Sequence, residues 1–84
     1  MSQKPQTKDE RFMVALYEIA EKKGDVFSPV NRFLIGKVIG LNEGALQTIC
    51  RTLLQTNFLR KSGDEDVYLT ELGEQLVLGF IESK

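Results

Sequence analysis

The feature that most constrains the fold is a break in the apolar pattern of the segment IGKVIGLNEGALQTIC, which begins at Ile35. Apolar side chains recur there at helical spacing, stop at Gly40-Leu41-Asn42, and resume four residues later at Leu46 on a new phase. Glycine adopts the left-handed conformation that ends a helix, and asparagine accepts hydrogen bonds from the first backbone N–H groups of the next one. The segment therefore predicts two helices joined by a sharp turn.

The spacing around this turn is that of a helix-turn-helix. Such a pair needs a small residue where the helices cross, a turn glycine, an apolar residue just after it, and apolar anchors on the second helix. Gly36 lies four residues before Gly40, and Leu41 follows Gly40 directly. Leu46 and Ile49 come six and nine residues after Gly40. All five positions agree with the pattern.

The length and composition favour one small globular domain. A chain of 84 residues buries one modest core, so we expect a single domain over residues 7–84 behind a disordered tail at residues 1–6. The apolar content of 42% and the charged content of 27% are typical of globular proteins that stay in water. No apolar run approaches the about 20 residues of a membrane helix. We therefore expect a cytoplasmic protein without a membrane partner.

The sequence offers little for catalysis or metal binding. It has no histidine, the side chain best suited to acid-base chemistry near neutral pH, and no grouping that suggests an activated nucleophile. Cys50 is the only cysteine, which excludes an intramolecular disulfide and a structural zinc site. We expect no enzymatic activity, no metal and no cofactor, and we expect Cys50 to be a small buried hydrophobe.

A capping box predicts the start of the first helix. Thr7 and Glu10 have the spacing at which two side chains satisfy each other's backbone donors, and Lys22-Lys23-Gly24 is typical of a helix end. The expected buried stripe consists of Phe12, Ala15, Leu16, Ile19 and Ala20. The apolar residues beside this stripe are Met13, Val14 and Tyr17. They indicate either a surface for a partner or a wider core.

Turn and strand signals predict the other elements. A bridging strand is expected at Val26–Phe27, and a second helix from Ser28-Pro29 or Asn31 to about Ile39. The third helix is expected over Asn42–Gln55, with a buried face made of Leu46, Ile49, Cys50, Leu53 and Leu54. Asn57 tolerates the left-handed conformation that stops this helix.

The last third of the chain predicts a hairpin and a helix. Strands Phe58–Lys61 and Val67–Leu69 are joined by the acidic, turn-rich loop Ser62–Asp66. Thr70 is expected to cap a final helix whose apolar residues are Leu72, Leu76, Val77, Phe80 and Ile81. Gly73 and Gly79 weaken that helix, so it needs packing to persist. The expected fold class is mainly α with a small β-hairpin.

The charges are unevenly distributed along a chain of net charge −1. Residues 1–30 carry five positive and five negative side chains, whereas residues 62–84 carry one positive against six negative, a net charge of −5. Residues 31–61 carry five positive side chains against one negative, a net charge of +4. The middle of the chain is therefore a basic segment, which favours an anionic partner.

From Asn31 to about Leu78 the sequence resembles a winged helix-turn-helix domain of prokaryotic transcription regulators, in particular the MarR-like type. The segment IGKVIGLNEGALQTICRTLLQTNFLRK is similar to the second helix, turn, recognition helix and first wing strand of that family. The segment VYLTELGEQLV resembles its second wing strand and the following LT-x-x-G pattern. The resemblance implies a three-helix core, a wing and a C-terminal helix. It also implies that Asn42–Gln55 enters the DNA major groove.

The helical repeat assigns candidate DNA-binding residues to the outward face of Asn42–Gln55. That face carries Glu43, Gly44, Gln47, Thr48, Arg51 and Gln55. Gln47, Thr48 and Arg51 have the donors and acceptors that contact base edges or phosphates. Asn42 is expected to cap the helix or to contact a phosphate. Gly44 and Gln55 complete the DNA-binding candidates on this helix, and the candidates for phosphate contacts are Arg32, Lys37, Arg60 and Lys61.

Two features bear on the partners. The loop Gly63-Asp64-Glu65-Asp66 would be repelled by phosphate, so the wing is not expected to insert into DNA. Few cations per chain favour a homodimer, which would present two recognition helices to double-stranded DNA. The expected dimer surface consists of Met13, Tyr17, Val77, Phe80 and Ile81, which could instead close the core of a monomer. The alternative function is a protein-interaction module that uses the acidic hairpin and the apolar terminal helices.

Overall fold

The computed structural model describes residues 7–82, with the backbone alone for Glu82, and it contains four helices and three strands in that range. The elements are α1 (Lys8–Lys22), β1 (Val30–Asn31), α2 (Arg32–Ile39), α3 (Glu43–Gln55), β2 (Leu59–Ser62), β3 (Asp66–Leu69) and α4 (Glu71–Glu82). The fold is thus mainly helical with a small antiparallel sheet, which confirms the predicted class. The tail predicted at residues 1–6 lies outside the described residues.

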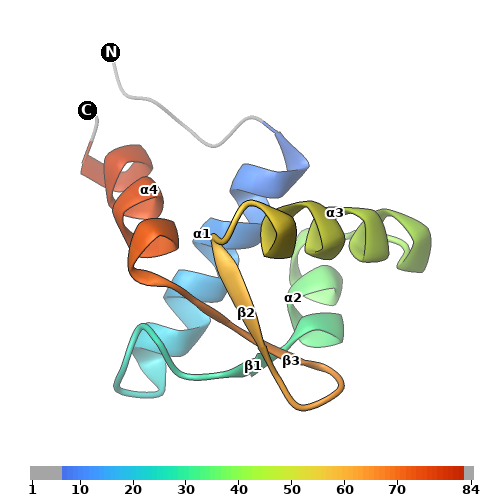
Figure 1. Cartoon of the computed structure of the whole chain (residues 1–84), viewed down its shortest axis with the longest axis horizontal. Helices are drawn as coiled ribbons and strands as arrows, with labels where there is room; N and C mark the ends of the chain where they lie inside the picture. The colour runs from blue at the N-terminus through green and yellow to red at the C-terminus, as the bar shows by residue number, and fades with distance from the viewer. Residues whose placement is uncertain (1–6, 83–84) are drawn as a thin grey trace.

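The sheet has three strands in the order β1-β3-β2, all antiparallel (Figure 1). Val67 pairs with Val30 of β1 and with Lys61 of β2, and Leu69 pairs with Leu59. Side chains alternate between the two faces of a strand, so Val67 and Leu69 lie on the same face, and both are buried. The predicted hairpin is confirmed, with its first strand one residue later than expected.

The strand predicted at Val26–Phe27 is wrong, because an aspartate closes a turn there. The carboxylate of Asp25 accepts a hydrogen bond from the backbone N–H of Phe27 at 2.9 Å. The backbone carbonyl of Asp25 accepts another from Ser28 at 2.9 Å. Aspartate commonly binds its own backbone two residues on. The chain therefore turns before it enters the sheet, and β1 forms at Val30–Asn31 instead.

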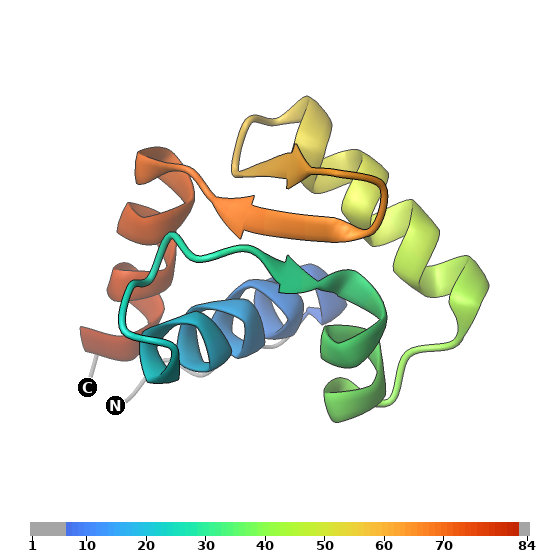
Figure 2. The same cartoon turned by 90° about the horizontal axis from the view of Figure 1, so that it is seen from below.

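Helix α1 is the centre of the structure. It packs against α2, α3 and α4 and against strands β1 and β3, as the view from below shows (Figure 2). The predicted capping box is confirmed, because Thr7 and Glu10 exchange hydrogen bonds of 3.2 and 3.3 Å. Phe12 and Leu16 of the predicted stripe are fully buried. Within residues 7–82 no helix is both long and apolar enough to cross a membrane.

The turn between α2 and α3 has the predicted geometry. Gly40 adopts the left-handed conformation with φ of 76°, and the backbone N–H of Leu41 donates to the carbonyl of Gly36 at 2.8 Å. Asn42 caps α3, because its side-chain oxygen accepts from the N–H of Ala45 at 2.8 Å. The helices cross closely, since a Cβ atom on Gly36 would lie 3.2 Å from Cδ2 of Leu46.

The start of α4 is held by Phe58, the residue that precedes β2. Thr70 donates its backbone N–H to the carbonyl of Phe58 at 3.1 Å, and its hydroxyl accepts from the N–H of Gly73 at 3.1 Å. A Cβ atom on Gly73 would overlap that same carbonyl of Phe58. Gly73 is therefore required by the close approach of α4 to the chain before β2.

We predict that Gly73→Ala lowers the free energy of unfolding by about 1–3 kcal/mol, because the added methyl group displaces either α4 or the backbone at Phe58. Gly79→Ala is the matched control, since a Cβ atom there meets open space. It is expected to be neutral or to stabilise by up to about 1 kcal/mol, because alanine favours helix more than glycine does. Urea unfolding of the two variants measures both values. Equal stability of Gly73→Ala and wild type would contradict the prediction.

Candidate nucleic-acid interface

Helix α3 turns one face into the core and a polar face outward. Four residues at helical spacing are buried, Leu46, Ile49, Cys50 and Leu53, whereas Leu54 is half-buried. The opposite face is exposed and consists of Asn42, Glu43, Gly44, Gln47, Thr48, Arg51 and Gln55. The predicted division of α3 into a core face and a polar face is confirmed. The functional role of the polar face stays a prediction.

Hydrogen bonds within α3 restrict two of these polar side chains. The oxygen of Asn42 is occupied by its capping bond to Ala45. The hydroxyl of Thr48 donates to the carbonyl of Gly44 at 3.1 Å, so only its oxygen and methyl group face outward. Within residues 7–82, the side chains of Gln47 and Arg51 form no hydrogen bond or ion pair. Their full hydrogen-bonding capacity is therefore available to a ligand.

A hollow of about 260 Å³ lies beside this face, between α3, the start of α2 and strand β2. We call it the cationic hollow, and its lining consists of Arg32, Gln47, Cys50, Arg51, Leu54 and Lys61. Its three cations come from three different elements, and no acidic residue lines it. A concave surface with charge of one sign focuses the electrostatic field, so this hollow attracts anions.

Arg32 is held in place by its neighbours at the start of α2. Asn31 caps the helix, because its side-chain oxygen accepts from the N–H of Phe33 at 2.8 Å. The guanidinium carbon of Arg32 lies 5.0 Å from the ring centroid of Phe33, a cation–π contact. The Nε atom is buried and has no hydrogen-bond partner among the described residues. These contacts restrict the side chain of Arg32 where it lines the hollow.

Cys50 forms the floor of the cationic hollow. Its side chain is buried, as predicted, and this burial raises the pKa of the thiol above its ordinary value. The positive charge of Arg32 opposes that rise, but burial is the larger effect. Near neutral pH the thiol is therefore protonated and neutral. The positive charge of the hollow is therefore not offset by a negative thiolate.

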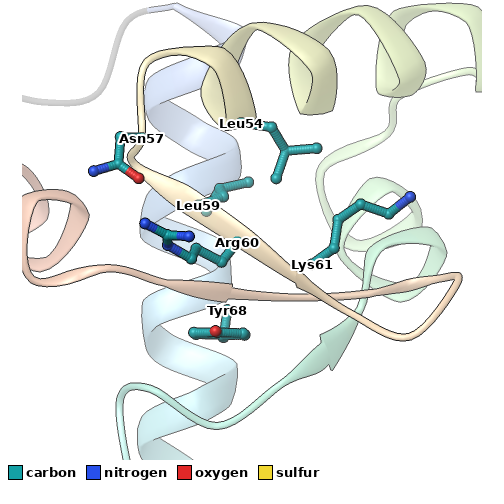
Figure 3. A pocket seen from close by; sticks show the side chains of 6 residues that line it. All are labelled: Leu54, Asn57, Leu59, Arg60, Lys61 and Tyr68. Carbon is teal, nitrogen blue, oxygen red and sulfur yellow. The ribbon is translucent and has the colours of Figure 1, made fainter.

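A second hollow, of about 390 Å³, lies along β2, and Figure 3 shows the side chains that line it. We call it the hairpin hollow, and its lining consists of Leu54, Asn57, Leu59, Arg60, Lys61 and Tyr68. Leu54 and Lys61 line both hollows. Arg60 and Tyr68 are paired across the two strands and so lie on the same face of the hairpin. The side chains of Arg60 and Lys61 leave β2 in opposite directions (Figure 3).

The acidic loop of the hairpin is tied to the start of α2. The backbone N–H of Arg32 donates to the carbonyl of Glu65 at 2.9 Å. The side-chain amide of Asn31 donates to the carboxylate of Glu65 at 3.5 Å. Asp64 and Glu65 are exposed, and Gly63 allows the turn with φ of 81°. Negative charge is therefore fixed at one end of the cationic hollow.

The two hollows bring together some of the predicted site residues and leave others apart. Gln47, Arg51, Arg32 and Lys61 share the cationic hollow, and Arg60 lines the hairpin hollow. The predicted residues that line neither hollow are Asn42, Gly44, Thr48, Gln55 and Lys37, all of them exposed. The sequence analysis missed Tyr68 and Asn57. The only signal for Tyr68 is its pairing with Arg60, which requires the register of the hairpin.

The predicted dimer surface is partly wrong. Met13 and Val77 are only 1% and 0% exposed, and both side chains belong to the hydrophobic core. Tyr17 is half-buried against that core, which favours the wider core over a partner surface. Phe80 is half-buried and Ile81 is 37% exposed. Only the last turn of α4 therefore retains accessible apolar surface from this set.

The chain was compared with known protein families, with characterised proteins and with solved structures, and none of them matches it. Among residues 7–82 no group of three or more acidic or cysteine side chains is placed to hold a metal ion. The evidence for function therefore consists of the exposed face of α3 and the two hollows beside it.

We predict that, in alkaline solution, the free energy of unfolding falls more steeply with pH for the wild-type protein than for the Cys50→Ala variant. Below the thiol pKa of the unfolded chain, about 8.5, both states hold the proton and stability does not depend on this group. Above that pH the unfolded chain loses the proton first, because burial raises the pKa in the folded state. The free energy of unfolding then falls as pH rises, by at most about 1.4 kcal/mol per pH unit.

Urea unfolding in the presence of a reducing agent, from about pH 7 to 10, measures this difference. All other side chains are common to both proteins, so only the difference between the two slopes belongs to Cys50. Parallel loss of stability in wild type and Cys50→Ala would show that the thiol is not protected by burial.

Proposed function

We propose that this protein is a sequence-specific DNA-binding protein, a small transcriptional regulator of the winged helix-turn-helix type. The helix Asn42–Gln55 would enter the major groove of double-stranded DNA. The observation that carries the proposal is the exposed pair Gln47 and Arg51 beside a hollow that holds three cations and no acid. A surface of this kind offers base contacts and phosphate contacts side by side.

The spacing of the polar residues suits the major groove, which is wide enough to admit one α-helix. Gln47 and Arg51 are four residues apart, so their Cβ atoms lie about 5–6 Å from each other on one helix face. Arginine pairs with guanine and glutamine with adenine through two hydrogen bonds each. Arg32 and Lys61 line the same hollow as Gln47 and Arg51, and this placement supports phosphate contacts next to the contacted bases.

The hairpin has a smaller part in this proposal than the wing of a typical family member. Asp64 and Glu65 are exposed at its tip, and phosphate repels them. Four cations line the two hollows, so a single chain makes few phosphate contacts and binds weakly. A homodimer belongs to the proposal for this reason, and Phe80 and Ile81 are the accessible residues of the expected surface.

A second candidate function is a protein-interaction module, and the exposed face of α2 favours it. Leu34 and Val38 are 48% and 61% exposed and lie four residues apart, with Phe33 beside them. Large apolar side chains gathered on one short helix are typical of contact surfaces. The acidic loop is a second surface that suits protein better than DNA. The two functions differ in whether Gln47 and Arg51 are required for binding.

We predict that the purified protein binds duplex DNA and that its affinity falls as the salt concentration rises. A plot of the logarithm of the association constant against the logarithm of the salt concentration is expected to have a slope of about −0.9 for each phosphate contact. Arg51→Ala is expected to weaken binding by about 1–3 kcal/mol, because one bidentate base contact is lost. Lys22→Ala is the matched control, since it removes one exposed positive charge at the far end of α1. Fluorescence anisotropy across a salt series measures these affinities.

The double variant Gln47→Ala with Arg51→Ala separates the two candidate functions. Loss of DNA binding in this variant, with Lys22→Ala close to wild type, is the result that the DNA-binding proposal requires. Unchanged DNA affinity after both replacements would contradict it and would favour the protein-interaction module.

A further inference from the structure

The hairpin hollow combines features that the duplex-binding proposal does not use. Its floor is apolar, because Leu59 is buried and Leu54 is half-buried. An aromatic ring, Tyr68, stands across the strand pair from Arg60 (Figure 3). Asn57 closes one side from the end of α3, where its backbone φ is 67°. The lining therefore extends around β2, with Arg60 and Tyr68 on one face of the hairpin and Leu59 and Lys61 on the other.

The polar groups of this hollow are available to a ligand. Within residues 7–82, the side chains of Asn57, Arg60, Lys61 and Tyr68 form no hydrogen bond with one another or with the rest of the chain. Asn57 uses only its backbone carbonyl, which accepts from the hydroxyl of Thr70 at 2.6 Å. No acidic residue lines the hollow, so a ligand that fits it carries negative charge.

We propose that the hairpin hollow binds an unpaired nucleotide of a DNA strand that continues from the duplex held by α3, an inference that rests on the proposed function. The flat base would stack on Tyr68, on the face of the hairpin that also carries Arg60, as bases stack on aromatic side chains in proteins that bind single strands. Asn57 would donate to or accept from the base edge. Arg60 would hold a phosphate beside that base, and Lys61, which leaves β2 in the opposite direction (Figure 3), would hold the phosphate of a neighbouring nucleotide.

The position of the hollow explains why an unpaired base fits better than a paired one. Both faces of a paired base are covered by its neighbours in the duplex, so only an unstacked base can lie on a tyrosine ring. The hairpin hollow shares Lys61 and Leu54 with the cationic hollow, so a strand that leaves one enters the other. The acidic loop lies at the opposite end of the hairpin and repels a backbone that would run that way.

The hollow also has a suitable size. Its volume of about 390 Å³ lies within the range of hollows that hold small molecules, and it is larger than the cationic hollow beside it. Its lining contains one aromatic side chain, Tyr68, so it can stack one base. The protein is therefore expected to prefer DNA that has a single-stranded extension next to a duplex over blunt duplex DNA.

Three kinds of labelled DNA test this inference by fluorescence anisotropy. The first is a blunt duplex, the second is the same duplex with a single-stranded extension, made once on the 3′ end and once on the 5′ end, and the third carries an extension of equal length made of abasic sites. We expect one polarity of the normal extension to bind at least about fivefold more tightly than the blunt duplex, because one stacked base contributes that much. The abasic extension keeps the phosphates and is expected to match the blunt duplex closely.

Two variants assign the effect to the hollow. Tyr68→Leu is expected to abolish the preference for the extended DNA, whereas Tyr68→Phe keeps the ring and is expected to retain it. The preference is a ratio of two affinities measured on one protein, so a general loss of stability cancels.

Each contrary outcome is distinct. Equal binding of the normal and abasic extensions would show that phosphates alone are bound and would overturn the inference. Blunt and extended DNA binding with equal affinity, or a preference that persists in Tyr68→Leu, would overturn it while the proposed duplex binding stands. A protein that binds none of the three DNAs would overturn both the inference and the proposed function.

Discussion

The close crossing of α2 and α3 fixes the position of every side chain in the candidate interface. Gly36 lets Leu46 approach the backbone of α2, and Gly40 turns the chain in a left-handed conformation that other residues adopt reluctantly. Because Leu46 packs against α2, the helical repeat places Gln47 and Arg51 on the outward face of α3. A shift of α3 by one residue about its axis would bury one of these polar side chains and expose part of the core.

The same crossing assembles a local positive charge in a chain whose net charge is −1. Arg32, Arg51 and Lys61 come from three elements that converge only because α3 is held against α2 and is followed directly by β2. The acids of the hairpin lie at its tip, where the backbone carbonyl of Glu65 accepts a hydrogen bond from the backbone N–H of Arg32. We propose that this separation gives DNA one permitted path across the surface, past α3 and β2 and away from the tip.

Local features of the fold could be predicted from the sequence, whereas features that depend on distant contacts could not. The caps at Thr7 and Asn42 and the turn at Gly40 are encoded within a few residues, and each was predicted. The turn at Asp25 was not predicted, and the strand expected at Val26–Phe27 is absent because the carboxylate of Asp25 accepts a hydrogen bond from the backbone N–H of Phe27. Burial of Met13 and Val77 depends on how α4 packs on α1, and periodicity gives no information about that packing. The pairing of Tyr68 with Arg60 depends on strand register.

The central claim is that the outward face of α3 and the cations beside it contact DNA. A titration of the isotopically labelled protein with duplex DNA, followed through its backbone amide NMR signals, tests this most directly. The account predicts that the largest changes fall on Gln47, Thr48, Arg51 and Lys61, with α1 and α4 little affected. Changes confined to α4 or to the exposed apolar face of α2, or no changes at all at low salt, would contradict it.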